Sequence, residues 1–172
     1  MTQKYISFAA TAALLATVLF GNYVTDHFGL IPVGFGLTAT AGIYLAGATF
    51  VLRDTLQDAA GKRVTVVIIA VAAGLSFLVA DASIALASAV AFLFAELADL
   101  AIYTPLRIRG YIRAAIASNI AGAFVDTVVF LAIAGFPIRE AIAGQMVGKL
   151  AITAAAVALV VTVRATRQKV AA

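Results

Sequence analysis

The chain has 172 residues, of which 64% are hydrophobic and only 12% are charged, and its mean hydropathy is +1.09. This composition excludes an ordinary soluble domain, because a soluble core of this size needs more polar cover. The net charge of +4 requires no nucleic-acid partner, and the absence of cysteine excludes disulfides, thiolate catalysis and cysteine-based metal sites.

Six apolar segments follow one another along the chain, and each reaches or approaches the roughly 20 residues that a helix needs to cross a bilayer. We predict membrane-spanning helices over residues 5–24, 34–52, 64–80, 83–103, 114–134 and 141–163. The first segment follows Lys4, as in a signal peptide, but no small-residue cleavage site comes after it, so an uncleaved helix is favoured. The prediction is a single all-α transmembrane domain over residues 1–172.

The distribution of cations predicts the orientation. With the amino terminus inside, ten Lys and Arg residues fall in cytoplasmic segments, whereas the outer loops hold only Arg139. The ten are Lys4, Arg53, Lys62, Arg63, Arg107, Arg109, Arg113, Arg164, Arg167 and Lys169. Because Lys and Arg collect on the cytoplasmic side, both termini are expected there, facing anionic inner-leaflet lipid. The six spans also divide into two halves of three with opposite orientation, as in inverted repeats.

Polar side chains interrupt the apolar segments, and such groups in hydrocarbon usually face a bundle interior or an aqueous cavity. They are Asn22, Glu96, Asp99, Asn119, Asp126, Gln145 and Lys149. At 1.5 Å per residue, Asp126 lies roughly 18 Å from the inner end of its span, and Lys149 lies roughly 12 Å from the outer end of its own. Both lie near the middle of the bilayer, where they form either a structural ion pair or a functional one.

A second polar layer is predicted nearer the cytoplasmic end. Glu96 and Asp99 are three residues apart and share a helix face, close to the depth of Asn119. The alternative is that the two carboxylates extend toward Arg107 or Arg109 at the membrane surface, and that Asn119 only links helices.

The remaining polar residues carry weaker predictions. Gln145 lies four residues before Lys149 and shares its face, although helix linking is again the alternative. Asn22 and His27 are expected near the outer surface, in contact with solvent. Since His27 is the sole histidine and no zinc, P-loop or nucleophile motif occurs, we predict a non-enzyme without metal or cofactor.

Glycines indicate close packing. Gly144 and Gly148 form a G-x-x-x-G on the sixth span, which permits close approach of another element. The second span contains Gly34, Gly36, Gly42 and Gly47. A broken helix there is an open alternative, because irregular backbone is tolerated where it is buried in protein or lines a cavity.

Several motifs carry a family resemblance. Residues 54–63 (DTLQDAAGKR) resemble the D-x-x-x-E-x-x-G signature of the queuosine precursor transporter family, also called the vitamin uptake transporter family, with Asp58 in place of Glu. Residues 88–99 (SAVAFLFAELAD) are similar to its S-x-x-A-F-x-x-x-[QE]-x-x-D. Residues 118–130 (SNIAGAFVDTVVF) match its S…D-T-x-x-F pattern, and Lys149 stands where its sixth helix carries a lysine.

The resemblance implies an inner-membrane importer of a prokaryote that carries 7-deazaguanine compounds such as preQ0, preQ1 or queuine for tRNA modification. A guanine-like edge offers two parallel N–H donors, which the carboxylate of Asp126 or Glu96 can accept together, while Asn119 suits the neighbouring carbonyl. Phe92, Phe94 and Phe130 are candidates to stack on the flat ring. The candidate substrate-binding residues are Phe92, Glu96, Asp99, Asn119, Asp126, Phe130 and Gln145.

Charged side chains are expected to gate the path of the substrate. Lys149 would neutralise Asp126 in the empty state and exchange partners when substrate arrives, and Arg53, Asp54 and Asp58 are further candidates for gating or ion pairing. Both proton coupling through a buried carboxylate and facilitated diffusion remain open.

Two other function classes stay open. Six short spans also suit the substrate-binding subunit of an energy-coupling-factor importer, which depends on an ATPase partner and docks through A-x-x-x-A spacing, as at Ala9 and Ala13 or at Ala12 and Ala16. A membrane scaffold is the third class. The expected partners are the heterocycle and the lipid bilayer, and the oligomeric state is open, a homodimer included.

Overall fold

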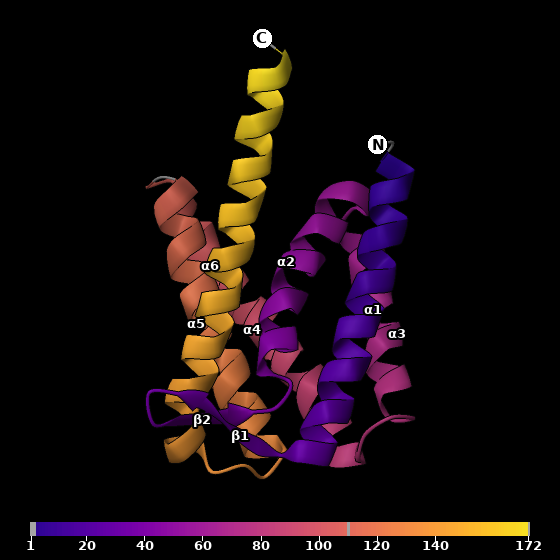
Figure 1. Ribbon diagram of the computed structural model, residues 1–172, viewed down its shortest axis with the longest axis vertical. Coiled ribbons are helices and arrows are strands. Elements are labelled where there is room, and N and C mark those ends of the chain that lie inside the picture. Colours follow the sequence, from indigo (N-terminus) through magenta and orange to yellow (C-terminus); the bar gives the residue numbers. More distant parts are fainter. Residues whose placement is uncertain (1–2, 110, 172) are drawn as a thin grey trace.

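The computed structural model describes residues 3–109 and 111–171, which form a bundle of helices with one small β-hairpin (Figure 1). The elements in chain order are α1 (Gln3–Phe28), β1 (Leu30–Gly34), β2 (Leu37–Thr40), α2 (Ile43–Ala60), α3 (Lys62–Ser76), α4 (Ala82–Arg107), α5 (Tyr111–Ile133) and α6 (Ile138–Ala171). The six predicted helices are therefore present among the described residues, with different bounds.

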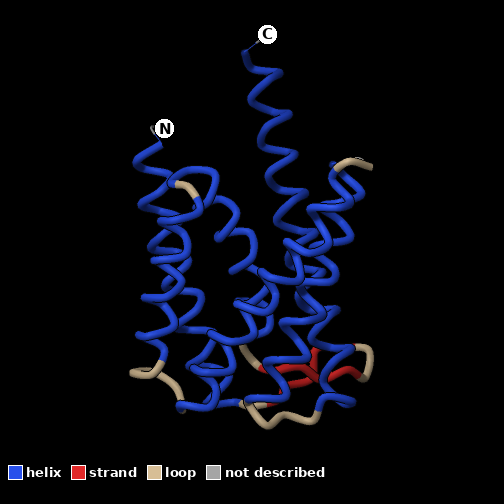
Figure 2. Tube along the Cα trace, turned by 180° about the vertical axis from the view of Figure 1, so that it is seen from behind, coloured by secondary structure: helices blue, strands red, loops and turns tan. Residues whose placement is uncertain are grey.

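The helices pack in two groups that α2 and α6 join. α4 and α5 lie side by side, and α1 packs against α2 and α3, while α6 runs along α2 and the hairpin. α1 begins and α6 ends at the same end of the bundle, and the hairpin lies at the opposite end (Figures 1 and 2). At that hairpin end, α4 is started by Asp81, which accepts a hydrogen bond from the Ser83 amide at 2.8 Å. Hydrogen bonding by Ser83 lowers the pKa of the Asp81 carboxyl.

The hairpin corrects the prediction of a second helix that begins at residue 34. Antiparallel pairing joins Leu30 to Thr40 and Ile31 to Ala39, and α2 begins only after it. The turn uses positive φ angles of 93° at Gly34 and 73° at Gly36, a conformation that glycine adopts without steric cost. Gly34 and Gly36 therefore favour a turn. The interruption agrees with the alternative that the second span is broken.

Three of the six helices are long and apolar enough to cross a membrane, as far as the described residues go. They are Gln3–Phe28, Ala82–Tyr103 and Ile116–Ile133. By contrast, α3 has 15 residues, or about 22 Å, which is short of the roughly 30 Å hydrocarbon core. α2 carries Arg53, Asp54 and Asp58 in its second half. A membrane protein is indicated, and six crossings stay a prediction.

Glycines bring α6 against the hairpin and α2. Gly144 lies so close to the Thr38 carbonyl that a Cβ would collide with it, and a Cβ on Gly148 would come within 2.8 Å of Ile43 Cγ1. The close approach predicted from the G-x-x-x-G is therefore confirmed, and its partner is this region of the chain. This packing sets α6 beside an interior cavity, which Gln145 and Lys149 line.

Candidate functional site

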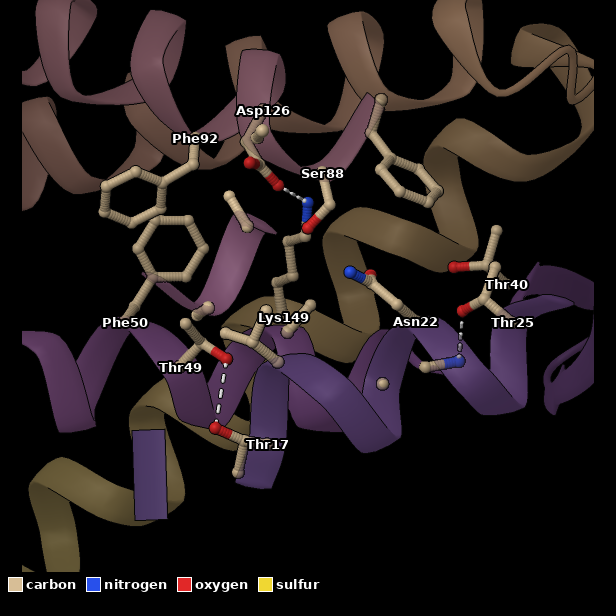
Figure 3. A pocket seen from close by; sticks show the side chains of 18 of the residues that line it. Thr17, Asn22, Thr25, Thr40, Thr49, Phe50, Ser88, Phe92, Asp126 and Lys149 are labelled. Atoms are coloured by element: carbon tan, nitrogen blue, oxygen red, sulfur yellow. Dashed lines mark hydrogen bonds and ion pairs between the residues drawn. The ribbon is translucent and has the colours of Figure 1, made fainter. Parts of the chain in front are cut away.

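A cavity lies inside the bundle, and all six helices and β2 contribute to its wall (Figure 3). Its empty volume is about 810 Å³, which includes the open space at its mouth. The polar residues that line it are Thr17, Asn22, Thr25, Thr40, Thr49, Ser88, Asp126, Gln145 and Lys149.

An ion pair between α5 and α6 forms one wall of the cavity. Lys149 Nζ donates to Asp126 Oδ2 and, at 2.9 Å, to the Thr127 hydroxyl. The Lys149 side chain is only 3% exposed and that of Asp126 is 15% exposed. The depth of the two residues in the sequence predicted this pairing, and the structure contains it. The two charges cancel, so this wall presents polar groups without a net charge.

Two buried amides also line the cavity. Asn22 Nδ2 donates to the Ser76 hydroxyl at 2.9 Å, and Gln145 Nε2 donates to the Thr40 hydroxyl at 2.7 Å. Gln145 was a predicted binding residue. The expectation that Asn22 is solvated is wrong, because α1 continues to Phe28 and places this side chain, 6% exposed, inside the bundle.

Aromatic rings contribute the apolar part of the wall. Phe92 and Phe130 were predicted, and Phe50 joins them from α2. Phe50 and Phe92 lie at one end of the cavity, the end nearer the two chain termini (Figure 3). Phe94, the other stacking candidate, is 49% exposed and is not part of the lining.

A second ion pair lies one helical turn beyond this aromatic end. Arg53 follows Phe50 by three residues on α2, and Glu96 follows Phe92 by four residues on α4. Arg53 Nη2 lies 2.6 Å from Glu96 Oε1, and Arg53 Nη1 lies 3.1 Å from Asp54 Oδ1. Arg53 is 8% exposed, and its Nε has no hydrogen-bond partner in the described part of the chain. Glu96 thus pairs with an arginine and is not part of the cavity lining.

The predicted inner layer of Glu96, Asp99 and Asn119 does not form one cluster. Asn119 is exposed, because α5 turns the neighbouring face with Ser118 and Gly122 toward the interior. Asp99 is partly buried, and its Cβ lies near the Gly122 position of α5. Neither residue lines the cavity.

The remaining gating candidates also lie outside the cavity. Asp54 and Asp58 are exposed near the end of α2. The lining residues that sequence reasoning missed come mainly from α1 and α2. A signal for them exists: Thr17, Gly21 and Thr25 recur every four residues, which gives the apolar helix α1 one small and polar face.

Residues 77–164 match the model of the family described as "Putative vitamin uptake transporter". These 88 residues, counted from 77 to 164, are just over half of the 172 in the chain. The chain belongs to this family. The matched region contains Asp126, Gln145 and Lys149, whereas the lining residues of α1 and α2 precede it. No curated protein and no solved structure matches the chain.

Proposed function

We propose that this member of the vitamin uptake transporter family imports a 7-deazaguanine compound, such as preQ0, preQ1 or queuine, across the inner membrane of a prokaryote. The observation that carries the proposal is the buried Asp126–Lys149 pair on the wall of a cavity that all six helices line. A buried ion pair beside empty space is expensive for a protein that only needs stability, since apolar side chains pack there at lower cost.

The cavity chemistry suits a flat heterocycle with N–H donors. Lys149 holds Oδ2 of Asp126, so Oδ1 is the first oxygen available to a ligand. If Lys149 moves away, both oxygens can accept the two parallel donors of a guanine-like edge, which is a bidentate arrangement. Phe50 and Phe92 provide apolar faces for the ring at the end of the cavity.

The Arg53–Glu96 pair is proposed as the gate on the side of the chain termini. It links α2 to α4 one turn beyond Phe50 and Phe92, so its separation would open that end of the cavity. The cation distribution supports a cytoplasmic position for this end, because Lys and Arg collect on the cytoplasmic side of membrane proteins. Release into the cytoplasm would then require this pair to break.

The test is the appearance of queuosine in tRNA of a strain that can neither make preQ0 nor import it. The strain expresses this chain and receives preQ0, preQ1 or queuine in turn. At least one compound is expected to restore queuosine. The Asp126→Asn variant is expected to lose rescue while still inserting in the membrane, and the control Asp26→Asn, at an exposed carboxylate outside the cavity, keeps it.

The substrate-binding subunit of an energy-coupling-factor importer is the alternative that one observation favours. Ala12 and Ala16 are exposed and lie one turn apart on α1, so they leave a smooth face on which a partner could pack. Rescue that requires a co-expressed ATPase module would support this alternative, and rescue by the chain alone would contradict it.

A further inference from the structure

The hydrogen bonds around Asn22 determine the direction in which its amide nitrogen and its carbonyl oxygen point. Ser76 uses its hydroxyl proton to donate to the Ala72 carbonyl at 2.9 Å. The Ser76 oxygen can therefore only accept from Asn22, so Nδ2 must point toward it and the Asn22 carbonyl oxygen must point away. The orientation follows from hydrogen-bond chemistry, whichever way the amide would otherwise turn.

The Asn22 carbonyl oxygen is left as an acceptor for a ligand. No described residue donates to Oδ1, although Asn22 is 6% exposed and lines the cavity. Figure 3 shows the Asn22 amide between Lys149 and Thr25, on the side of the cavity away from the aromatic end. The oxygen is open to the cavity, so a ligand that covers it without donating a hydrogen bond would leave it unsatisfied, and a ligand N–H placed there avoids this cost.

Other polar groups of the cavity have the same character. The Thr17 hydroxyl donates to the Ala13 and Leu14 carbonyls, and the Thr49 hydroxyl donates to the Leu45 carbonyl and, at 3.4 Å, to the Thr17 oxygen. The protons of both hydroxyls are thus used within the chain, and their oxygens act toward the cavity as acceptors. Lys149 is neutralised by Asp126. The surface is thus rich in acceptors and has no uncompensated positive charge for a carboxylate ligand.

We infer that Asn22 is a specificity-determining residue, whose fixed carbonyl oxygen selects neutral or cationic ligands with ring N–H donors and rejects carboxylates. The inference rests on the proposed function in that it assumes the cavity holds the transported molecule. Asn22 lies outside residues 77–164, the region that matches the family.

The experiment measures binding to the purified full chain by ligand-dependent thermal stabilisation. The probes are guanine, 9-methylguanine, in which the N–H of the five-membered ring is blocked and the edge proposed for Asp126 is intact, and nicotinate, a flat carboxylate. We expect the unsubstituted chain to bind guanine roughly tenfold more tightly than 9-methylguanine, the factor for one lost hydrogen bond with a buried partner, and not to bind nicotinate.

The Asn22→Leu variant removes the acceptor and keeps the branching of the side chain, and it is expected to bind guanine and 9-methylguanine equally. Asn22→Asp keeps the acceptor oxygen and is expected to keep the preference. Asn119→Leu is the matched control, because it makes the same change at an exposed position outside the cavity. The melting temperature of each free variant shows whether it is folded. If Asn22→Leu is not folded, the smaller Asn22→Ala replaces it, with the same expected loss of the preference.

Three results would overturn the inference: an unchanged preference in Asn22→Leu, binding of nicotinate, or no binding of either purine by the unsubstituted chain. Failure of the proposed function looks different. In that case tRNA rescue would be absent for all three deazaguanines, while guanine would still bind in a manner that depends on Asn22.

Discussion

Lys149 is a buried cation that pairs with one carboxylate, that of Asp126, in the described part of the chain. Its ammonium group donates to Asp126 and Thr127 on α5, and its side chain is 3% exposed. Loss of one member of such a pair leaves an uncompensated charge in a medium of low dielectric constant, which costs far more than replacing both members together. Replacing both members can therefore test the proposed role of the pair in transport without leaving an unpaired buried charge.

We predict strongly non-additive effects for this pair. Asp126→Asn alone and Lys149→Met alone are each expected to destabilise the folded chain by about 3–5 kcal/mol, whereas the double variant costs less than either. Unfolding of the purified variants in detergent measures this. Additive losses would mean that the pair does not exist in solution. A folded double variant that fails to transport would show that transport needs at least one of the two charged groups.

The Arg53–Glu96 pair gives a second prediction for single residues. Since the chain has no cysteine, Thr49→Cys creates one thiol in the cavity wall without background. Adding Glu96→Gln is expected to raise its reaction rate with a charged thiol reagent roughly tenfold in inside-out vesicles, equivalent to about 1.4 kcal/mol of lost closing free energy.

The control for the gate is Glu140→Gln in the same Thr49→Cys background, because Glu140 is exposed at the start of α6 and distant in sequence from both gate helices. It is expected to leave the rate unchanged. Equal rates in Glu96→Gln and in the parent would show that this ion pair does not close the cavity.

At the scale of elements, α6 depends on close contact with the hairpin. A Cβ at Gly144 would meet the Thr38 backbone carbonyl, which cannot move aside as the end of a flexible side chain can. The contact places Gln145, the next residue, within hydrogen-bonding reach of Thr40. Packing between these two elements therefore positions a cavity residue.

Gly144→Ala is predicted to destabilise the chain by about 1–3 kcal/mol, because the added methyl separates α6 from β2. Gly74→Ala on α3 is the matched control, since an added Cβ there meets nothing within 4 Å and alanine favours helix by up to about 1 kcal/mol. Thermal unfolding of both variants checks the contrast. Equal stability of the two would contradict the packing described here.

The sequence predicts some elements and site residues well and others poorly, for physical reasons. The Asp126–Lys149 pair could be predicted, because depth along a helix follows from counting residues. The burial of Asn22 could not be predicted, because it depends on the continuation of α1 to Phe28. The pairing of Glu96 with Arg53 was not predicted either. Helices with such a broad apolar surface have no sequence pattern that determines which face each turns toward its neighbours.

At the scale of the whole molecule, we expect the two ends of the bundle to lie on opposite sides of the membrane. Phe35 in the hairpin turn is 97% exposed, and Ile108 after α4 is 88% exposed. The hairpin lies at one end, and α1 begins and α6 ends at the other (Figure 1). Both positions are therefore suitable sites for a reporter thiol.

In intact cells, Phe35→Cys is predicted to react with a membrane-impermeant thiol reagent, and Ile108→Cys is predicted to react only after the membrane is opened. The cation distribution is the physical reason, because Lys and Arg stay on the cytoplasmic side. Labelling of Ile108→Cys in intact cells would reverse the orientation, and labelling of both would contradict a single topology.

We propose that this chain alone carries a 7-deazaguanine through a cavity in which Asp126 binds the substrate. Uptake of labelled preQ0, preQ1 and queuine into liposomes that contain only the purified protein tests this most directly. We predict that at least one compound enters, that the Asp126→Asn variant loses this uptake, and that Asp26→Asn retains it. No uptake of any of the three, or equal uptake by Asp126→Asn, would contradict the account.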